Sequence, residues 1–175
     1  MDKQIYIYTN GSVVSKKTEK ILKEKLEKCG FTIPSVFTDS AELLVCIGGD
    51  GTFLDTIHKF NFPNIPIIGI NTGHLGFFQE IMPDQLDDFI FNYTQGKYSL
   101  QPLSTVKIVV KAHNGTNVHI GLNEVAIKGD STYSVHLNIS IDGSFVERFS
   151  GDGILVATAS GSTAYNYSLG GSIVD

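Results

Sequence analysis

Cysteine and long apolar runs are scarce in this sequence. Its two cysteines, Cys29 and Cys46, cannot make the disulfide framework of a small secreted protein. No uninterrupted apolar stretch approaches the roughly 20 residues that a membrane-spanning helix requires. The N-terminus carries an acidic residue, Asp2, and soon turns polar, which is not typical of a signal peptide. We therefore expect a soluble, cytoplasmic protein with no membrane partner.

Positive charge is also scarce. Asp+Glu 18 exceed Lys+Arg 13, the formal net charge is −5, and Arg148 is the single arginine. Proteins that bind nucleic acids usually carry a basic excess, and arginine is the residue that reads bases and clamps phosphates through two hydrogen bonds. The composition therefore argues against a nucleic-acid partner. Any phosphate group would be held by backbone N–H groups, a few lysines or a metal ion.

What the sequence does have is a globular composition. Of its 175 residues, 42% are hydrophobic and 18% are charged, so a disordered chain is excluded. This length accommodates one ordinary domain or two small ones.

The first half of the chain alternates expected strands and helices. Apolar runs that end in polar or glycine-rich turns indicate strands buried on both faces of a parallel sheet. The first helix is expected to have Ser15 as its N-cap, with Ile21 and Cys29 on its buried stripe. The expected strands are 4–8, 43–47 and 65–70, and the expected helices are 15–28, 52–60 and 83–94. We predict a β-α-β domain over residues 1–98.

The second half of the chain is rich in β-forming residues. Asn114-Gly115 and Asp142-Gly143 are strong signals for hairpin turns. The expected strands are 104–112, 117–128, 133–141, 144–149 and 153–158, followed by a helix at 161–170. We predict a β-rich, sandwich-like domain over residues 99–175, so the fold class is α/β followed by β-rich.

One segment resembles a phosphate-binding P-loop without matching it. Residues 11–18 follow an expected strand and precede an expected helix, as a P-loop does. Lys16 stands where that loop needs a glycine, because the backbone must curl around a phosphate. We therefore interpret this segment as an ordinary strand-to-helix turn.

The turn at residues 48–52 (GGDGT) directly follows a buried strand. Its glycines cost chain entropy but let a ligand approach the backbone, and N–H groups at the start of a helix suit phosphates. Asp50 would repel a phosphate unless it accepts a proton from an attacking hydroxyl or holds a divalent cation, and both roles indicate phosphoryl transfer. The alternative is a tight turn in which Asp50 caps the helix.

Three further segments combine polar residues with strand ends. Residues 71–77 (NTGHLGF) follow the next parallel strand, where α/β sheets bind ligands, and His74 within them is interpreted as structural. Asn123 and Glu124 interrupt an apolar strand, so at least one of them faces a ligand or another unusual environment, unless the strand lies at a sheet edge or contains a bulge. Residues 158–165 bring hydroxyl groups and helix N-terminal amides together, as an anion or ribose site does.

Four motifs resemble those of a known family. They are IGGDGTF at 47–53, GINTGHLGFF at 69–78, LNEVAIK at 122–128 and the segment 152–174, which begins DGILVATASGSTAY. In this order and spacing they resemble the bacterial NAD kinases. The resemblance implies phosphorylation of the 2′-hydroxyl of the adenosine ribose of NAD to give NADP. It also implies ATP or polyphosphate as donor, Mg²⁺ as the divalent cation, and a homodimer or homotetramer with the site between the two domains.

The resemblance also assigns roles to single residues. Asp50 would be the general base that takes the 2′-hydroxyl proton, and Asp152 would contact the nicotinamide end of NAD. The implied phosphate loop consists of Gly48, Gly49 and Thr52. The other implied substrate contacts are Gly51, Phe53, Asn123, Glu124, Ser160, Thr163, Ala164, Tyr165 and Ser168, with Tyr165 offering a stacking face. No residue is assigned to the metal.

The chain departs from the family pattern in three places, and two rival functions stay open. Ser150 stands where relatives often carry a basic residue, and Ala159 where they often carry proline. Family chains also continue beyond the point where this one stops, at Asp175. The GGDGT motif alone is shared with lipid kinases that phosphorylate diacylglycerol or sphingosine. A lipid kinase and a non-catalytic NAD-binding fragment are therefore the alternatives.

Overall fold

The computed structural model of the chain describes residues 3–74, 76–130 and 132–174. Leu75, inside the 69–78 motif, and Asp175, the last residue, lie outside the described residues. The chain divides into two compact units, Met1–Leu100 and Gln101–Asp175. Within the described part of the chain, no helix is long and apolar enough to cross a membrane.

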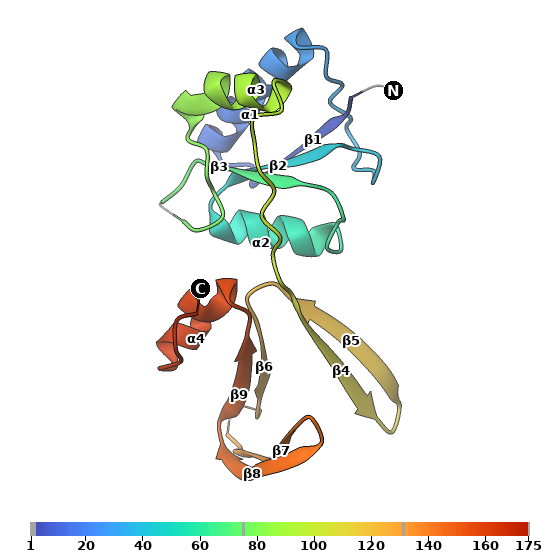
Figure 1. The fold of residues 1–175 in the computed structure, drawn as a ribbon, viewed down its shortest axis with the longest axis vertical. Helices are drawn as coiled ribbons and strands as arrows, with labels where there is room; N and C mark the ends of the chain where they lie inside the picture. Colours follow the sequence, from blue (N-terminus) through green and yellow to red (C-terminus); the bar gives the residue numbers. More distant parts are fainter. Residues whose placement is uncertain (1–2, 75, 131, 175) are drawn as a thin grey trace. The chain divides into compact units, whose positions relative to one another are not determined.

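The first unit is built on a three-stranded parallel sheet (Figure 1). The strands are β1 (Ile5–Thr9), β2 (Leu43–Gly48) and β3 (Ile67–Asn71), paired in the order β1-β2-β3. The helices are α1 (Val13–Lys28), α2 (Asp50–Lys59) and α3 (Leu86–Thr94), the last preceded by the 3-10 turn η1 (Pro83–Gln85). The predicted alternation of strands and helices is confirmed.

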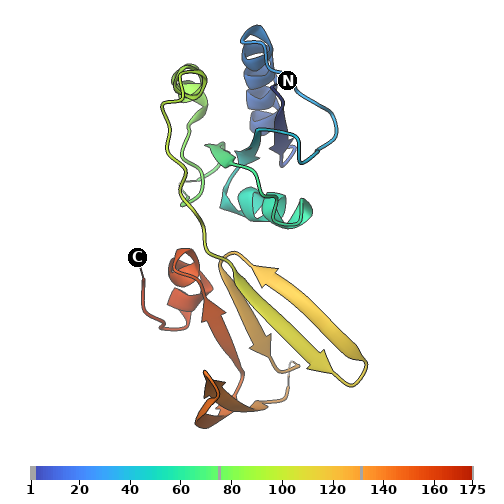
Figure 2. The ribbon, with the colours of Figure 1, turned by 45° about the vertical axis from the view of Figure 1, so that its right-hand side comes forward.

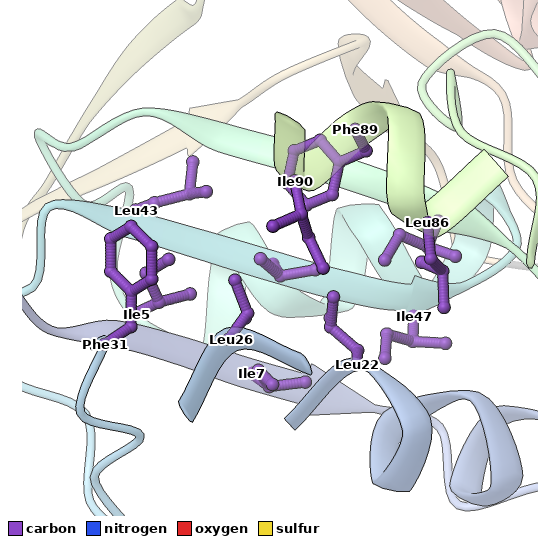
Figure 3. Packing of buried hydrophobic residues seen from close by; sticks show 12 residues of the cluster. Ile5, Ile7, Leu22, Leu26, Phe31, Leu43, Ile47, Leu86, Phe89 and Ile90 are labelled. Atoms are coloured by element: carbon purple, nitrogen blue, oxygen red, sulfur yellow. The ribbon is translucent and has the colours of Figure 1, made fainter. Parts of the chain in front are cut away.

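The alternation of side chains along β1 separates two packed layers. Ile5 and Ile7 point to the face covered by α1 and α3, where Leu22 and Leu26 of α1 are fully buried (Figure 3). Tyr6 points to the other face and meets Phe60, which caps the end of α2. Each large aliphatic side chain removed from water here contributes about 1.5–3 kcal/mol. The sheet is therefore packed against helices on both faces.

Between β1 and β2 the chain passes from one edge of β1 to the other. Ile5 N–H donates to the carbonyl of Thr32 (3.0 Å), whereas the carbonyl of Gln4 accepts from Glu42 N–H (2.9 Å), just before β2. Because successive backbone groups of a strand point to opposite edges, Thr32 lies on the edge of β1 away from β2. The chain then crosses to the other edge, so α1 and α2 cover opposite faces. Open α/β sheets bind ligands at such crossings, beyond the carboxyl ends of the strands.

The start of α1 differs from the prediction. The N-cap is Ser12, whose hydroxyl accepts from Ser15 N–H (3.2 Å), so the predicted cap at Ser15 is wrong. Ser15 is instead fully buried, and its hydroxyl bonds that of Thr72 (2.7 Å). The predicted stripe is also partly wrong, because Ile21 and Cys29 are exposed. A sequence pattern cannot distinguish two serines three residues apart when one is recruited by a distant loop.

The second unit consists of three two-stranded antiparallel ladders (Figure 2). They pair β4 (Val106–Ala112) with β5 (Gly115–Gly121), β6 (Glu124–Lys128) with β9 (Gly153–Ala157), and β7 (Val135–Ile141) with β8 (Ser144–Gly151). A 3-10 turn, η2 (Ser160–Thr163), and one helical turn, α4 (Tyr165–Ser168), follow. The fold class, an α/β unit followed by a β-rich unit, is confirmed.

Two details of the second unit correct the prediction. The expected strand 117–128 is broken at residues 122–123, because β5 ends and the chain turns into β6 with a new partner, β9. The expected helix 161–170 is only η2 and α4, since the chain bends between them at Ala164 (φ −89°, ψ −128°). Both predicted hairpins form, and Asp142 and Gly143 adopt the positive φ angles that such turns require.

Candidate active site

The GGDGT turn lies at the carboxyl end of the central strand. β2 ends at Gly48, Gly49 is the N-cap of α2, and Asp50 is the first helical residue. Thr52 is buried, and its hydroxyl accepts from Gly49 N–H (3.4 Å), which closes the turn on itself. Around Gly49 and Gly51 a methyl group would meet no atom within 4 Å, so the backbone of the turn is open to a ligand.

The carboxylate of Asp50 is held by the loop after β3. Its Oδ2 accepts from Phe77 N–H (2.8 Å) and its Oδ1 from Phe78 N–H (3.0 Å). The alternative in which Asp50 caps its own helix is therefore wrong, because Gly49 is the cap and the carboxylate turns away to a segment 27 residues later. The side chain of Phe77 is 76% exposed, so only its backbone engages Asp50.

A buried glutamine that the sequence analysis missed lies beneath the turn. Gln79 is 6% exposed, and its Nε2 donates to the carbonyl of Gly49 (3.0 Å) and lies 3.9 Å from Cys46 Sγ. Its Oε1 has no partner within the described residues. Burial raises the pKa of the Cys46 thiol, so this sulfur stays protonated beside the amide. The only sequence signal was its position directly after the 69–78 motif.

Gln79 allows a stability prediction. Gln79→Glu would place a carboxylate oxygen against the Gly49 carbonyl, and we expect it to lower the free energy of unfolding by about 3–5 kcal/mol at neutral pH. Gln79→Met loses the hydrogen bond but also removes an unpaired acceptor, so about 1 kcal/mol is expected. Urea unfolding of both variants measures the difference. Equal stability of the two variants would contradict the hydrogen bond from Gln79 Nε2 to the carbonyl of Gly49.

The segment after β3 is held to the end of β2 and also bonds within itself. Thr72 N–H donates to the carbonyl of Gly48 (2.9 Å), and Asn71 Nδ2 donates to the carbonyl of His74 (3.0 Å). The side chain of His74 is exposed, so the residue contributes to the structure through its backbone. Phe53 is 4% exposed and stacks on Phe78, with ring centroids 4.9 Å apart. Its ring packs the turn against the loop.

In the second unit, the side chains of Asn123 and Glu124 each present an acceptor that no described residue satisfies. Asn123 lies in the bend between β5 and β6, and Glu124 begins β6. Asn123 Oδ1 and Glu124 Oε2 are buried and unpaired within the described residues. Burial raises the pKa of Glu124, which favours its protonated form. Buried acceptors are normally satisfied, so a ligand with N–H or O–H donors matches this pair.

The bend that carries Asn123 is held by the segment after β9. Thr158 N–H donates to the carbonyl of Asn123 (2.8 Å), and its hydroxyl donates to the carbonyl of Leu122 (2.7 Å). The same hydroxyl accepts from Gly161 N–H (3.1 Å) and lies 3.1 Å from Ser160 Oγ. Thr158 therefore holds the bend at residues 122–123 to the start of η2. No individual role was predicted for it from the sequence.

The remaining predicted contacts lie at the start of β9 and in the segment of η2 and α4 that follows it. Glu124 pairs with Ala157 at one end and Lys128 with Gly153 at the other, about 13 Å away along the strands. Asp152, at the second end, is exposed. Lys128 lies over the ring of Tyr165, with its Nζ 4.6 Å from the centroid. Of the other predicted contacts, Ser160, Thr163 and Ala164 are half-buried and Ser168 is exposed.

Ser150, which stands where relatives often carry a basic residue, lies beside a histidine. His136 pairs with Ser150 across the β7–β8 ladder, and His136 Nδ1 lies 2.8 Å from Ser150 Oγ. The neighbouring strand therefore places an imidazole nitrogen beside the position where the resemblance led us to expect a basic residue.

No ready-made metal cage is visible in the part of the chain that the structure describes. Among those residues, no group of three or more His, Cys, Asp or Glu side chains could hold a metal ion. Mg²⁺ is commonly bound through one or two carboxylates and the phosphates of a substrate, keeping several water ligands. The single carboxylate of the GGDGT turn, Asp50, fits a Mg²⁺ ion that is bound mainly by substrate phosphates and water. One carboxylate is too few for a site made of protein ligands alone.

Comparisons with known proteins agree on one family. Residues 6–98 match the model of the ATP-NAD kinase N-terminal domain, and residues 122–175 match that of the ATP-NAD kinase C-terminal domain. The NAD kinase of Finegoldia magna is 44% identical over 174 residues, covering 98% of this chain and 64% of that protein. That of Staphylococcus carnosus is 36% identical over 141 residues, covering 78% and 52%. The chain thus spans between about half and two thirds of these relatives.

Two solved structures are also similar. Yeast NADH kinase complexed with NADH has a TM-score of 0.87 and 23% identity, covering 99% of this chain and 62% of that protein, and shows the shared fold. An NAD kinase from Archaeoglobus fulgidus in complex with ATP has a TM-score of 0.71 and 25% identity, covering 98% and 67%.

Proposed function

The chain belongs to the ATP-NAD kinase family, and from this premise we propose that it transfers a phosphoryl group from ATP or polyphosphate to the 2′-hydroxyl of the adenosine ribose of NAD. The observation that carries this proposal is the GGDGT turn, in which an oriented carboxylate, Asp50, stands beside open backbone at Gly49 and Gly51. That combination suits a hydroxyl acceptor and a phosphate donor at the same place.

In the proposed reaction, Asp50 accepts the proton of the 2′-hydroxyl. The freed oxygen attacks the terminal phosphorus of the donor, and the bond from that phosphorus to the bridging oxygen breaks. With ATP the products are NADP, ADP and one proton, which Asp50 later releases to water. Gly48, Gly49, Gly51 and Thr52 would lie against the donor phosphates at the start of α2, where the helix favours negative charge. Catalysis is then mostly positioning and charge stabilisation.

A divalent cation, Mg²⁺, is part of the proposal. When bound, it would neutralise the charge on the donor phosphates. Within the described residues the only carboxylate in the GGDGT turn is that of Asp50. Each of its oxygens accepts a hydrogen bond from one backbone N–H and keeps a second lone pair free. We propose that the phosphates supply most of the ligands of the ion.

The second unit would recognise the dinucleotide. Asn123 Oδ1 and Glu124 Oε2, both buried and unpaired, suit the amino group or hydroxyls of a nucleoside. Tyr165 would stack on a ring of the ligand, with Lys128 covering its other face. Asp152 would contact the nicotinamide end, and the remaining contacts would come from Phe53, Ser160, Thr163, Ala164 and Ser168.

The proposal extends to the surroundings of the site. We propose a cytoplasmic homodimer or homotetramer with a domain boundary near residue 98. The matches to both family models favour this activity over a GGDGT-type lipid kinase. A non-catalytic NAD-binding fragment remains the second candidate, because the chain spans less than two thirds of the curated relatives that it matches.

The decisive experiment is an assay for NADP with this chain, Mg²⁺ and either ATP or polyphosphate. We expect NADP to form from NAD, and no phosphorylation of diacylglycerol in a parallel reaction. Omitting Mg²⁺ or adding EDTA should abolish the product. Isothermal titration calorimetry with NAD separates the two candidates, since binding of NAD without NADP formation would favour the non-catalytic fragment. Phosphorylation of diacylglycerol but not NAD would overturn the proposal.

A further inference from the structure

The amide pair that holds Asp50 belongs to a loop that is itself anchored. Phe77 N–H and Phe78 N–H each donate to one oxygen of the carboxylate, at 2.8 and 3.0 Å. One residue further on, Gln79 Nε2 donates to the carbonyl of Gly49, next to Asp50 (3.0 Å). The two segments are therefore joined by hydrogen bonds of both kinds. The side chain of Asp50 in the turn accepts from the loop backbone, and the side chain of Gln79 donates to the turn backbone.

Gly76 is the residue that makes this close approach sterically feasible. A methyl group at Gly76 would lie 2.3 Å from Asp50 Oδ1, 2.5 Å from its Cγ and 2.7 Å from its Oδ2. The backbone of Gly76 does not have a positive φ, so the conformation alone does not demand glycine. The three atoms nearest to that methyl group all belong to the carboxylate of Asp50.

The two amides fix the direction of the Asp50 carboxylate and leave lone pairs free on both of its oxygens. Each carboxylate oxygen has two lone-pair sites, and each amide occupies one of them. One site on each oxygen stays free to accept a hydroxyl proton, now in a fixed direction. A free aspartate would move among several rotamers, and a misplacement of about 1 Å in a reacting group can cost about 10²-fold in rate.

We propose that Gly76, together with the amides of Phe77 and Phe78, is the positioning element for the Asp50 carboxylate. This inference rests on the proposed function for its kinetic part, and on contacts alone for its structural part. Gly76 is a positioning residue, since it acts on the reaction only through Asp50. Any side chain at position 76 would push the carboxylate off the two amides.

The kinetic test compares Gly76→Ala with the unmodified chain in the NADP assay. The expected result is a kcat lowered by about 10²-fold, with the KM for NAD almost unchanged, because nothing at position 76 binds the nucleotide in the proposed site. An unchanged kcat in a stable, folded Gly76→Ala variant would overturn the proposal while leaving the proposed function standing. Absence of NADP from the unmodified chain would instead count against the proposed function.

A double-mutant cycle tests the contact independently of activity. Gly76→Ala should lower the Tm by about 5 °C or more, whereas adding it to an Asp50→Ala background should lower the Tm far less, because the clashing carboxylate is gone. Gly73→Ala is the matched control in the same loop, since a methyl group there meets its nearest atoms at 3.9 and 4.0 Å. Its effect on Tm should be small and additive with Asp50→Ala. Additivity of Gly76→Ala and Asp50→Ala would refute the inference.

Discussion

Asparagine in place of Asp50 is expected to lower the rate of NADP formation by about 10²- to 10⁴-fold, the usual contribution of a positioned general base. The amide has the shape of the carboxylate, and its oxygen can still accept one of the two loop amides, from Phe77 or Phe78. Its nitrogen cannot accept a proton at neutral pH. The fold and the affinity for NAD should therefore be largely kept, as calorimetry would measure.

The matched control for this variant lies on the same helix. Asp55→Asn makes the same change in charge and size, but Asp55 is exposed and has no part in the proposed site. It should leave turnover unchanged. Normal turnover in Asp50→Asn would remove Asp50 from the role of general base. A low rate in both variants would point instead to an effect of charge on the helix as a whole.

Alanine in place of Gly161 is expected to raise the Kd for NAD by about 10- to 100-fold. A methyl group there would lie 1.9 Å from the carbonyl oxygen of Asn123, 2.4 Å from its carbon and 2.6 Å from its Cα. These are backbone atoms, so no side-chain rotation relieves the clash. Overpacking of this kind costs about 1–3 kcal/mol, and the strain falls on the bend that presents Asn123 and Glu124.

Gly151→Ala is the control for this second prediction. There the three atoms nearest to a methyl group, the closest at 2.7 Å, all belong to the end of the Phe149 ring, and a side chain can turn aside. Calorimetry with NAD should give a Kd close to that of the unmodified chain. If Gly161→Ala also bound NAD normally, the bend at residues 122–123 would have no part in the nucleotide site.

Local sequence patterns were sufficient for the elements of the first unit. The apolar runs that became β2 and β3 are followed by glycine-bearing turns, and each pattern is contained within a few residues. Strand type and approximate position follow from such local information. The same is true of the hairpin at Asp142-Gly143, where the turn residues themselves have the required backbone conformation.

Errors appeared where a distant partner competes with a local pattern. Ser15 is a good N-cap by sequence, but it bonds Thr72, 57 residues away, and Ser12 caps the helix instead. The segment 117–128 was predicted as one strand, yet it changes partner from β4 to β9 at the bend that carries Asn123. Pairing partners are a property of the whole fold, so a window of ten residues cannot reveal them.

The sequence by itself determined the family resemblance, the two-part architecture and the candidate residues for the chemistry, because each is written in contiguous motifs. Only the tertiary structure decided how those motifs cooperate. It shows that Asp50 is held by amides 27 and 28 residues later, that the Gln79 amide bonds the carbonyl of Gly49 within the turn, and that Gly76 lies against the Asp50 carboxylate. These contacts depend on the parallel pairing of β2 with β3, which brings the two turns to the same edge of the sheet.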